Sequence, residues 1–279
     1  MRVEILAYLA EVNKKIITFV LYSLCVFYTA GVVAKPSLIF GVVPQQSAAK
    51  LAQQWQPLLD RWGELAGVEI RFATARDIPT FETRLLAGEY DMSYMNPYHF
   101  TLVNHTPGYT ALARAKDKQI KGILVVRRDW QGDLQDLQNQ VIAFPAPRAF
   151  GASIINQSEL GQKGINFEAK FVGSHDSVYL GVAKGLYPAG GGVGRTFNSF
   201  DDKTKQELKI IYRTNAYTPH AFAVSNQIAP EVKQALRDAI TLLNQDPQAQ
   251  RSFSMLSIKG LQTAQDSDWD DIVQLGISL

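Results

Sequence analysis

The stretch that decides the fold is Leu38-Ile39-Phe40-Gly41-Val42-Val43-Pro44-Gln45-Gln46-Ser47. It predicts a strand over Leu38–Val43 that leads into a helix over Ala48–Leu65, with the Ser47 hydroxyl capping the first turn. The other N–H groups of that turn, together with the helix dipole, favour an anion beyond the strand end. An ordinary capped strand–helix turn has the same local pattern, so its recurrence along the chain decides between the two interpretations.

Strands and helices alternate in two series. Hydrophobic periodicity predicts two further strands and a helix in the first series, at Val68–Ala73, Tyr90–Tyr94 and Pro79–Ala87. The second series has strands at Leu137–Phe144, Glu168–Val172 and Ala189–Val193, with helices at Phe150–Leu160 and Asp176–Ala183. The order predicts an α/β fold of two similar lobes, each a mostly parallel sheet flanked by helices.

Two extended segments border the second series, Gln119–Val126 and Ile210–Ser225, and we expect them to be hinge crossovers. The domain division would then be a first part of lobe I over 35–120, lobe II over 121–212, and a return to lobe I over 213–279. A helix over Pro230–Asn244 has apolar residues on one stripe, so the C-terminal tail should pack back on lobe I.

The first 34 residues have the pattern of a secretory signal. Lys14 and Lys15 precede an apolar run that ends in small residues, which predicts cleavage after Ala34 and export to the periplasm. An uncleaved membrane anchor is the alternative, because the run approaches the length of a membrane span. Cys25, the only cysteine, lies in this run, so the remainder has no cysteine for a disulfide, a thiolate nucleophile or a metal site.

The composition is that of an ordinary globular protein. Hydrophobic residues make up 46% of the chain, charged residues 19%, and the net charge is +2. Because no basic run is interleaved with aromatic residues, a nucleic-acid surface is not expected.

Four helix starts follow strand ends, two in each lobe. In a parallel α/β sheet, ligands bind beyond the carboxyl ends of strands, so a cleft between the lobes would have helix N-termini on both walls. The residues at these starts that we expect to contact a ligand are Gln46, Ser47, Asn96, Tyr98, Arg148, Phe150, Ser174, His175 and Asp176.

Glycines at 190–192 remove side chains from the end of a strand and permit close approach of a ligand or another segment. Arg195 follows and can present a planar donor fork to an oxyanion. Gly190 and Gly192 match the first two glycines of a dinucleotide-binding motif, but Arg195 occupies the position of the third, so this motif is not supported. The adjacent Ser174-His175-Asp176 cannot form a catalytic triad, and the four histidines lack zinc-site spacing, so we expect no catalysis, metal or cofactor.

Four motifs together resemble one family: the stretch from Phe40 to Ser47, the turn Leu86-Ala87-Gly88-Glu89-Tyr90-Asp91, Tyr94-Met95-Asn96-Pro97-Tyr98, and Gly173-Ser174-His175-Asp176-Ser177. The chain is similar to the PhnD-like phosphate, phosphite and phosphonate-binding proteins of ABC transporters, which are type II periplasmic binding proteins.

The resemblance implies a hinged protein that closes on a small oxyanion and delivers it to an inner-membrane ABC permease, without catalysis. It places Gln46, Ser47, Tyr94 and Tyr98 on the wall of lobe I. His175 and Asp176 would face the ligand from lobe II, with Ser174 as the helix cap. We expect a monomer.

The chain departs from the family pattern at two places. Arg148-Ala149-Phe150 stands before Gly151 where the family has serine and threonine, and no acid lies near Gly194 to suit the amino group of a substrate. We hypothesise that Arg148 and Arg195 replace the missing hydroxyl donors with charge.

Three functions remain open from the sequence. The first is a periplasmic solute receptor for import, and the second is a membrane-retained sensory domain that signals to a histidine kinase or similar partner. An enzyme on the same fold is the third, and the absence of a reactive residue argues against it. The identity of the ligand and of the permease stays open.

Overall fold

The computed structural model describes residues 8, 11–16, 35–275 and 277. The expected signal peptide or anchor falls mostly outside the described residues. Ser37–Leu279 is a compact unit, and the fold below is that unit. Among the described helices, none combines the length and the apolar character that a membrane span requires.

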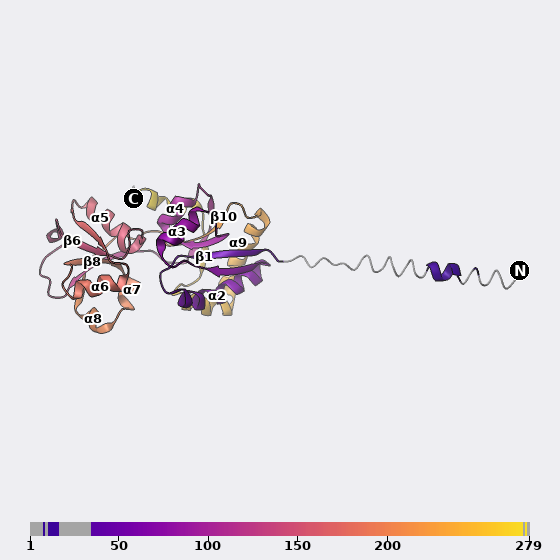
Figure 1. Cartoon of the computed structure of the whole chain (residues 1–279), viewed down its shortest axis with the longest axis horizontal. Coiled ribbons are helices and arrows are strands. Elements are labelled where there is room, and N and C mark those ends of the chain that lie inside the picture. Colours follow the sequence, from indigo (N-terminus) through magenta and orange to yellow (C-terminus); the bar gives the residue numbers. More distant parts are fainter. Residues whose placement is uncertain (1–7, 9–10, 17–34, 276, 278–279) are drawn as a thin grey trace. The chain divides into compact units, whose positions relative to one another are not determined.

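The first sheet has six strands in the order β11-β4-β10-β3-β1-β2. We call this sheet and its helices lobe I (Figure 1). Its strands are β1 (Ser37–Val42), β2 (Glu69–Ala73), β3 (Met92–Met95), β4 (Tyr109–Ala115), β10 (Ala221–Ser225) and β11 (Leu261–Thr263). Its helices are α2 (Ala48–Ala66), α3 (Ile78–Leu86), α4 (Pro97–Val103), α9 (Pro230–Gln245), α10 (Pro247–Met255) and α11 (Asp270–Val273), the last preceded by a 3-10 turn at Asp266–Trp269.

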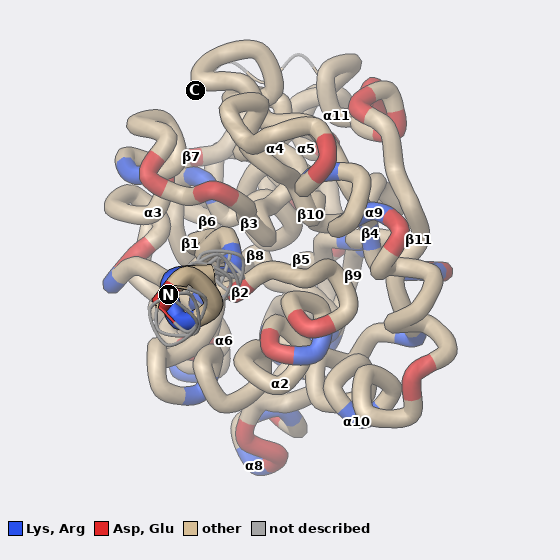
Figure 2. Tube along the Cα trace, turned by 90° about the vertical axis from the view of Figure 1, so that its right-hand side faces the viewer, with Lys and Arg blue, Asp and Glu red and all other residues tan. Residues whose placement is uncertain are grey.

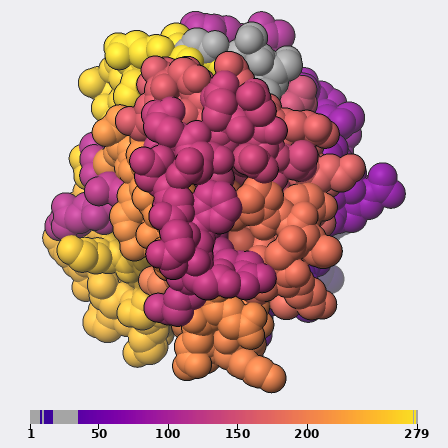
Figure 3. Space-filling view, turned by 90° about the vertical axis from the view of Figure 1, so that its left-hand side faces the viewer, coloured from indigo at the N-terminus to yellow at the C-terminus, as the bar shows by residue number. Residues whose placement is uncertain are grey.

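The second sheet has five strands in the order β7-β6-β8-β5-β9, and we call it and its helices lobe II. Its strands are β5 (Gly122–Arg127), β6 (Val141–Phe144), β7 (Glu168–Phe171), β8 (Ala189–Val193) and β9 (Leu208–Arg213). Its helices are α5 (Ile155–Gln162), α6 (His175–Ala183), α7 (Gly194–Asn198) and α8 (Asp202–Gln206). Figure 3 looks onto the side of lobe II, where these magenta to orange segments cover the surface.

The expectation of mostly parallel sheets is wrong. β1 pairs parallel with β2 and β3, but β10 runs antiparallel to both β3 and β4. In lobe II, β5 likewise runs antiparallel to both β8 and β9. Parallel neighbours need a crossover connection, whereas β5 and β10 enter their sheets directly from the inter-lobe connectors. The two-lobed α/β fold itself is confirmed.

The core of lobe I lies on both faces of its sheet. On one face α2, α9 and α10 bury a cluster that includes Leu58, Trp62, Leu236 and Phe253. The indole N–H of Trp62 donates to the Leu236 carbonyl oxygen at 3.0 Å, which joins α2 to α9. The C-terminal tail therefore packs on lobe I, as expected.

The predicted strand over Leu137–Phe144 is too long by four residues. Gln135–Leu137 forms a 3-10 turn, and Asn139 has a φ of 61°, a left-handed conformation that interrupts a strand. The predicted helix from Phe150 also begins differently, with a π-helical turn over Phe150–Ile154 before α5.

The glycines of β8 are needed for packing within the protein. A Cβ atom at Gly191 would lie 2.2 Å from the Ala152 carbonyl oxygen, and one at Gly192 would lie 2.2 Å from the Tyr179 hydroxyl oxygen. The close approach predicted from the sequence is confirmed, and the approaching groups belong to lobe II itself.

Two connectors join the sheets, one between β4 and β5 and the other between β9 and β10. They pair with each other through Ile120 and Tyr217, whose backbones exchange two hydrogen bonds of 2.9 Å. The buried Glu159 carboxylate of α5 accepts from the Asn215 N–H at 2.9 Å and from the Tyr217 hydroxyl at 2.8 Å. α5 of lobe II thus holds the connector that returns to lobe I.

Charged residues are distributed without segregation by sign. In Figure 2 acidic and basic residues are interspersed along the trace, in keeping with the small net charge.

Candidate ligand-binding site

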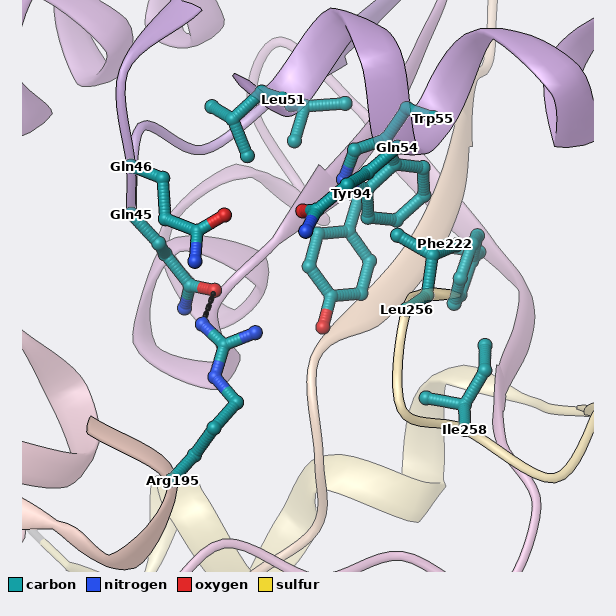
Figure 4. Close-up of a pocket in the computed structure, with 11 residues that line it drawn as sticks. Gln45, Gln46, Leu51, Gln54, Trp55, Tyr94, Arg195, Phe222, Leu256 and Ile258 are labelled. Atoms are coloured by element: carbon teal, nitrogen blue, oxygen red, sulfur yellow. Dashed lines mark hydrogen bonds between the residues drawn. The ribbon is translucent and has the colours of Figure 1, made fainter. Parts of the chain in front are cut away.

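A pocket lies beneath the turn from β1 to α2 (Figure 4). Its apolar wall consists of side chains that include Trp55, Tyr94 and Phe222, and its polar wall carries Gln45, Gln46, Gln54 and Arg195. All of the lining residues except Arg195 come from lobe I. The pocket therefore depends on one cationic side chain that lobe II contributes.

Arg195 is held against lobe I by a chain of polar contacts. Its Nη2 donates to the Gln45 Oε1 at 2.9 Å, a bond drawn in Figure 4. The Gln45 Nε2 in turn lies 2.9 Å from the His220 Nε2. The His220 ring stacks on Tyr94, with 4.8 Å between ring centroids and 14° between planes. These contacts orient the guanidinium at the pocket.

Arg195 acts electrostatically on groups from both lobes. Burial, followed by the charge of Arg195, lowers the pKa of His175 to about 4. Burial lowers the pKa of His220 to about 3, and Arg195 and Lys118 contribute in the same direction. Burial raises the pKa of Tyr94 to about 12, against the effect of Arg195. Both histidines and the tyrosine are therefore neutral at pH 7.

The net charge of the side chains around the pocket is positive. Among the described residues, no carboxylate forms an ion pair with Arg195 or with Lys118. An unpaired guanidinium in a pocket with neutral neighbours favours an anion, and its planar fork suits an oxyanion with two acceptor oxygens. The buried Gln46 Oε1 has no hydrogen-bond partner there, so it remains available as an acceptor.

Of the residues expected from the sequence, Gln46, Tyr94 and Arg195 line this pocket. His175 lies at the start of α6, where its Nδ1 is 3.1 Å from the Thr196 Oγ1, next to Arg195 in the chain. The structure thus brings three other expected residues, Gln46, Tyr94 and His175, close to Arg195.

Three expected residues serve as helix caps. Ser47 accepts from the Lys50 N–H at 3.4 Å, and Ser174 accepts from the Ser177 N–H at 3.1 Å. Asn96 accepts from the His99 N–H at 2.8 Å and donates its Nδ2 to the Arg148 carbonyl oxygen at 3.2 Å. These side chains define where α2, α6 and α4 begin.

Two expected aromatic residues are buried rather than open to a cleft. Tyr98 and Phe150 belong to one apolar cluster, to which both lobes contribute. The Phe150 ring meets Tyr217 edge to face, with centroids 6.2 Å apart. Asp176, by contrast, is exposed in the first turn of α6, where a carboxylate stabilises the helix dipole.

Arg148 has a protein partner. Its Nη1 forms an ion pair with the Oε1 of Glu82, a residue of α3 that is only 4% exposed. The other Glu82 oxygen lies 3.4 Å from the His99 Nε2. Burial lowers the pKa of His99 to about 3, so this ring is neutral and Arg148 is the cation that balances Glu82.

Sequence reasoning missed several residues of this region, above all His220, Lys118 and Glu82. His220 and Lys118 lie in the two connectors, where no strand–helix turn marks a site. Glu82 occupies the middle of a helix, a position typical of a solvated acid. Gln45 was missed as well, although its position next to Gln46 in the opening stretch could have indicated it. Within the described residues, no group of three or more histidine, cysteine, aspartate or glutamate side chains has metal-binding geometry.

Comparisons with known proteins agree on one family. A family profile described as "ABC transporter, phosphonate, periplasmic substrate-binding protein" matches residues 40–269. The phosphate-import protein PhnD of Mycolicibacterium smegmatis is 22% identical over 244 residues, covering 75% of this chain and 72% of its own.

Solved structures share the fold. PhnD1 from Prochlorococcus marinus, in complex with methylphosphonate, superposes with a TM-score of 0.74 at 18% identity, covering 86% of this chain and 97% of its own. A binding protein component of an ABC phosphonate transporter from Pseudomonas aeruginosa has a TM-score of 0.73 at 16% identity, with 87% and 86% covered.

The comparisons give no support to the sensory alternative. Because the matching profile spans most of the chain, this protein belongs to the family of periplasmic substrate-binding proteins of phosphonate ABC transporters.

Proposed function

We propose that this protein binds a phosphate- or phosphonate-type oxyanion between its lobes and delivers it to an ABC permease in the inner membrane. The observation that carries the proposal is Arg195, a lobe II cation without a carboxylate partner that reaches a lobe I pocket through Gln45. The methylphosphonate bound to the Prochlorococcus marinus relative and the phosphate named for the Mycolicibacterium smegmatis relative support this choice of ligand class.

In this proposal Arg195 binds the anionic oxygens, while Gln46 and Tyr94 contact the ligand from lobe I and His175 from lobe II. Burial of His175 and His220 in the neutral form leaves their ring nitrogens able to accept or donate without adding charge. Arg148 acts mainly between the lobes, because Glu82 already balances its charge. No step of the cycle requires catalysis.

A thermal-shift screen of the purified protein tests the ligand class. Phosphate, phosphite, methylphosphonate, sulfate and acetate are compared at matched ionic strength, with potassium chloride as the control. Because a ligand that binds only the folded form stabilises it, a hundredfold excess over Kd should raise Tm by about 5–10 °C for a phosphorus oxyanion. If none of the phosphorus oxyanions moves Tm beyond the chloride control, the proposed ligand class is wrong.

Export belongs to the same proposal. The lysines before the apolar run and the small residues at its end support cleavage after Ala34 and release to the periplasm. N-terminal sequencing of the exported protein should start near Lys35, and a start at Met1 in a membrane fraction would favour an anchor.

A further inference from the structure

Lys118 lies in the connector between β4 and β5, close to the pocket that contains Arg195. Its Nζ donates to the Ser257 carbonyl oxygen at 3.0 Å. Ser257 lies between Leu256 and Ile258, and both of these residues line the pocket. The ammonium group of Lys118 is thus held beside the pocket wall formed by the C-terminal tail. Lys116 and Lys121 of the same connector are exposed.

Lys118 and Arg195 act on the same small region. Burial lowers the pKa of Lys118, and the nearby charge of Arg195 lowers it further. Both cations also lower the pKa of His220, which contacts Gln45, the partner of Arg195. Through Ser257, Lys118 is held next to Leu256 and Ile258, which line the same pocket as Arg195, so a connector and lobe II each bring a cation to this region.

Neither cation is neutralised within the described part of the chain. Among the described residues, the Lys118 ammonium donates to one acceptor, a carbonyl oxygen that carries no full charge and uses one of the three N–H donors. Lys118 is half-buried and Arg195 is exposed, so the two like charges repel each other through partly screening solvent. An anion placed between them replaces this repulsion with two attractions.

We propose that Lys118 is a second cationic residue of the ligand site and that Lys118 and Arg195 together select a doubly charged phosphoryl or phosphonyl group over singly charged anions. This inference rests on the proposed function, because it concerns the charge of the oxyanion bound there. It also gives the connector a role in binding: the anion links lobe II to the segment about which the lobes move, and closure is favoured when the site is filled.

The test compares two ligands that differ in charge and little in size. Methyl phosphate is close to a dianion at about pH 8, well above its second pKa of about 6, whereas dimethyl phosphate is a monoanion. Titration calorimetry at low salt measures the Kd of both for the wild type, Lys118→Met and Lys118→Arg. Lys116→Met is the matched control, since it removes an exposed lysine from the same connector.

We expect the wild type to bind methyl phosphate at least about tenfold more tightly than dimethyl phosphate, about 1.4 kcal/mol of preference. Lys118→Met should remove most of this preference by weakening methyl phosphate alone, while Lys118→Arg and Lys116→Met should retain it. A ratio of Kd values that stays unchanged in Lys118→Met, or an equal loss for both ligands, overturns the role of Lys118. A wild type that binds phosphate or methylphosphonate but shows no preference for methyl phosphate over dimethyl phosphate overturns this inference alone. A wild type that binds none of these phosphorus oxyanions overturns the proposed function and this inference with it.

Discussion

Arg195 is the residue through which lobe II reaches the pocket of lobe I. Its guanidinium is oriented by Gln45, which is 150 positions away in the sequence. His175, His220 and Tyr94 surround it as neutral groups. In the proposed site, the charge available for an oxyanion comes from this side chain and from Lys118.

Replacement of Arg195 by glutamine should weaken oxyanion binding strongly. Glutamine keeps a donor but loses the charge, and hydrogen bonds to charged groups contribute about 1.5–3 kcal/mol, so Kd should rise by about 10- to 100-fold. Titration calorimetry with methylphosphonate measures the change. Arg213→Gln, at an exposed position of β9, is the control and should leave Kd unchanged. An unaltered Kd in Arg195→Gln would contradict the assignment.

Arg148 should behave differently, because its partner is the buried Glu82. Arg148→Ala leaves a carboxylate without its cation and should lower the free energy of unfolding by about 3 kcal/mol. In Arg148→Ala/Glu82→Gln the unpaired charge is absent, so part of that stability should return. Urea denaturation of the wild type, both single variants and the double variant gives the four free energies of unfolding of a double-mutant cycle. If the double variant is destabilised by the sum of the single changes, the two residues are not coupled.

At the scale of elements, α5 and the return connector form one unit. The Glu159 carboxylate accepts hydrogen bonds from Asn215, Tyr212 and Tyr217. Burial and this carboxylate together raise the pKa of Tyr212 and of Tyr217, so both hydroxyls stay protonated and donate. The connector is therefore held to lobe II at the point where it pairs with Ile120.

Glu159→Gln should loosen this unit. The amide side chain has one acceptor oxygen instead of two, so at least one buried donor loses its partner, at a cost of about 1–3 kcal/mol. Hydrogen exchange should become faster at the amides of Asn215 and Tyr217 while the core of lobe I keeps its protection. Glu168→Gln, at the exposed start of β7, serves as the control. Equal exchange at Asn215 in both variants would show that Glu159 does not hold the connector.

At the scale of the whole molecule, lowering the pH should destabilise the fold at pH values above those at which its carboxylates are protonated. Burial lowers the pKa of His99, His175 and His220 to about 3, 4 and 3, against about 6.5 in the unfolded chain. The unfolded state then binds more protons, so the stability from these residues is complete above pH 6.5 and is lost as the pH falls toward the folded values. For the fully buried His99 the loss is about 2 kcal/mol at pH 5.

Urea unfolding at a series of pH values checks this expectation. The free energy of unfolding should fall by a few kcal/mol between about pH 7.5 and pH 5, with a slope that corresponds to more than one proton. A slope of zero in this range would contradict the burial of neutral histidines.

Local sequence determined the strands and helices of the two predicted series, the caps at Ser47 and Ser174, and the small residues of β8. Hydrophobic period and capping depend on residues that are close in the chain, so the sequence alone suffices to predict them. The expectation of hinge crossovers over Gln119–Val126 and Ile210–Ser225 is corrected, because most of their residues belong to β5, β9 and β10. The position of Gln46, Tyr94, His175 and Arg195 at or beside the pocket was predictable, because strand ends and helix starts mark the ligand side of an α/β sheet.

Only the tertiary structure decided the antiparallel entry of β5 and β10, the pairing of Arg148 with Glu82, and the position of Lys118 and His220 beside Arg195. These features join residues that are far apart in the chain, and their energies arise from burial and from charges brought close by folding. The sequence by itself therefore determined which segments could hold an anion, whereas the packing of connectors and lobes decided which cations remain unpaired to bind it.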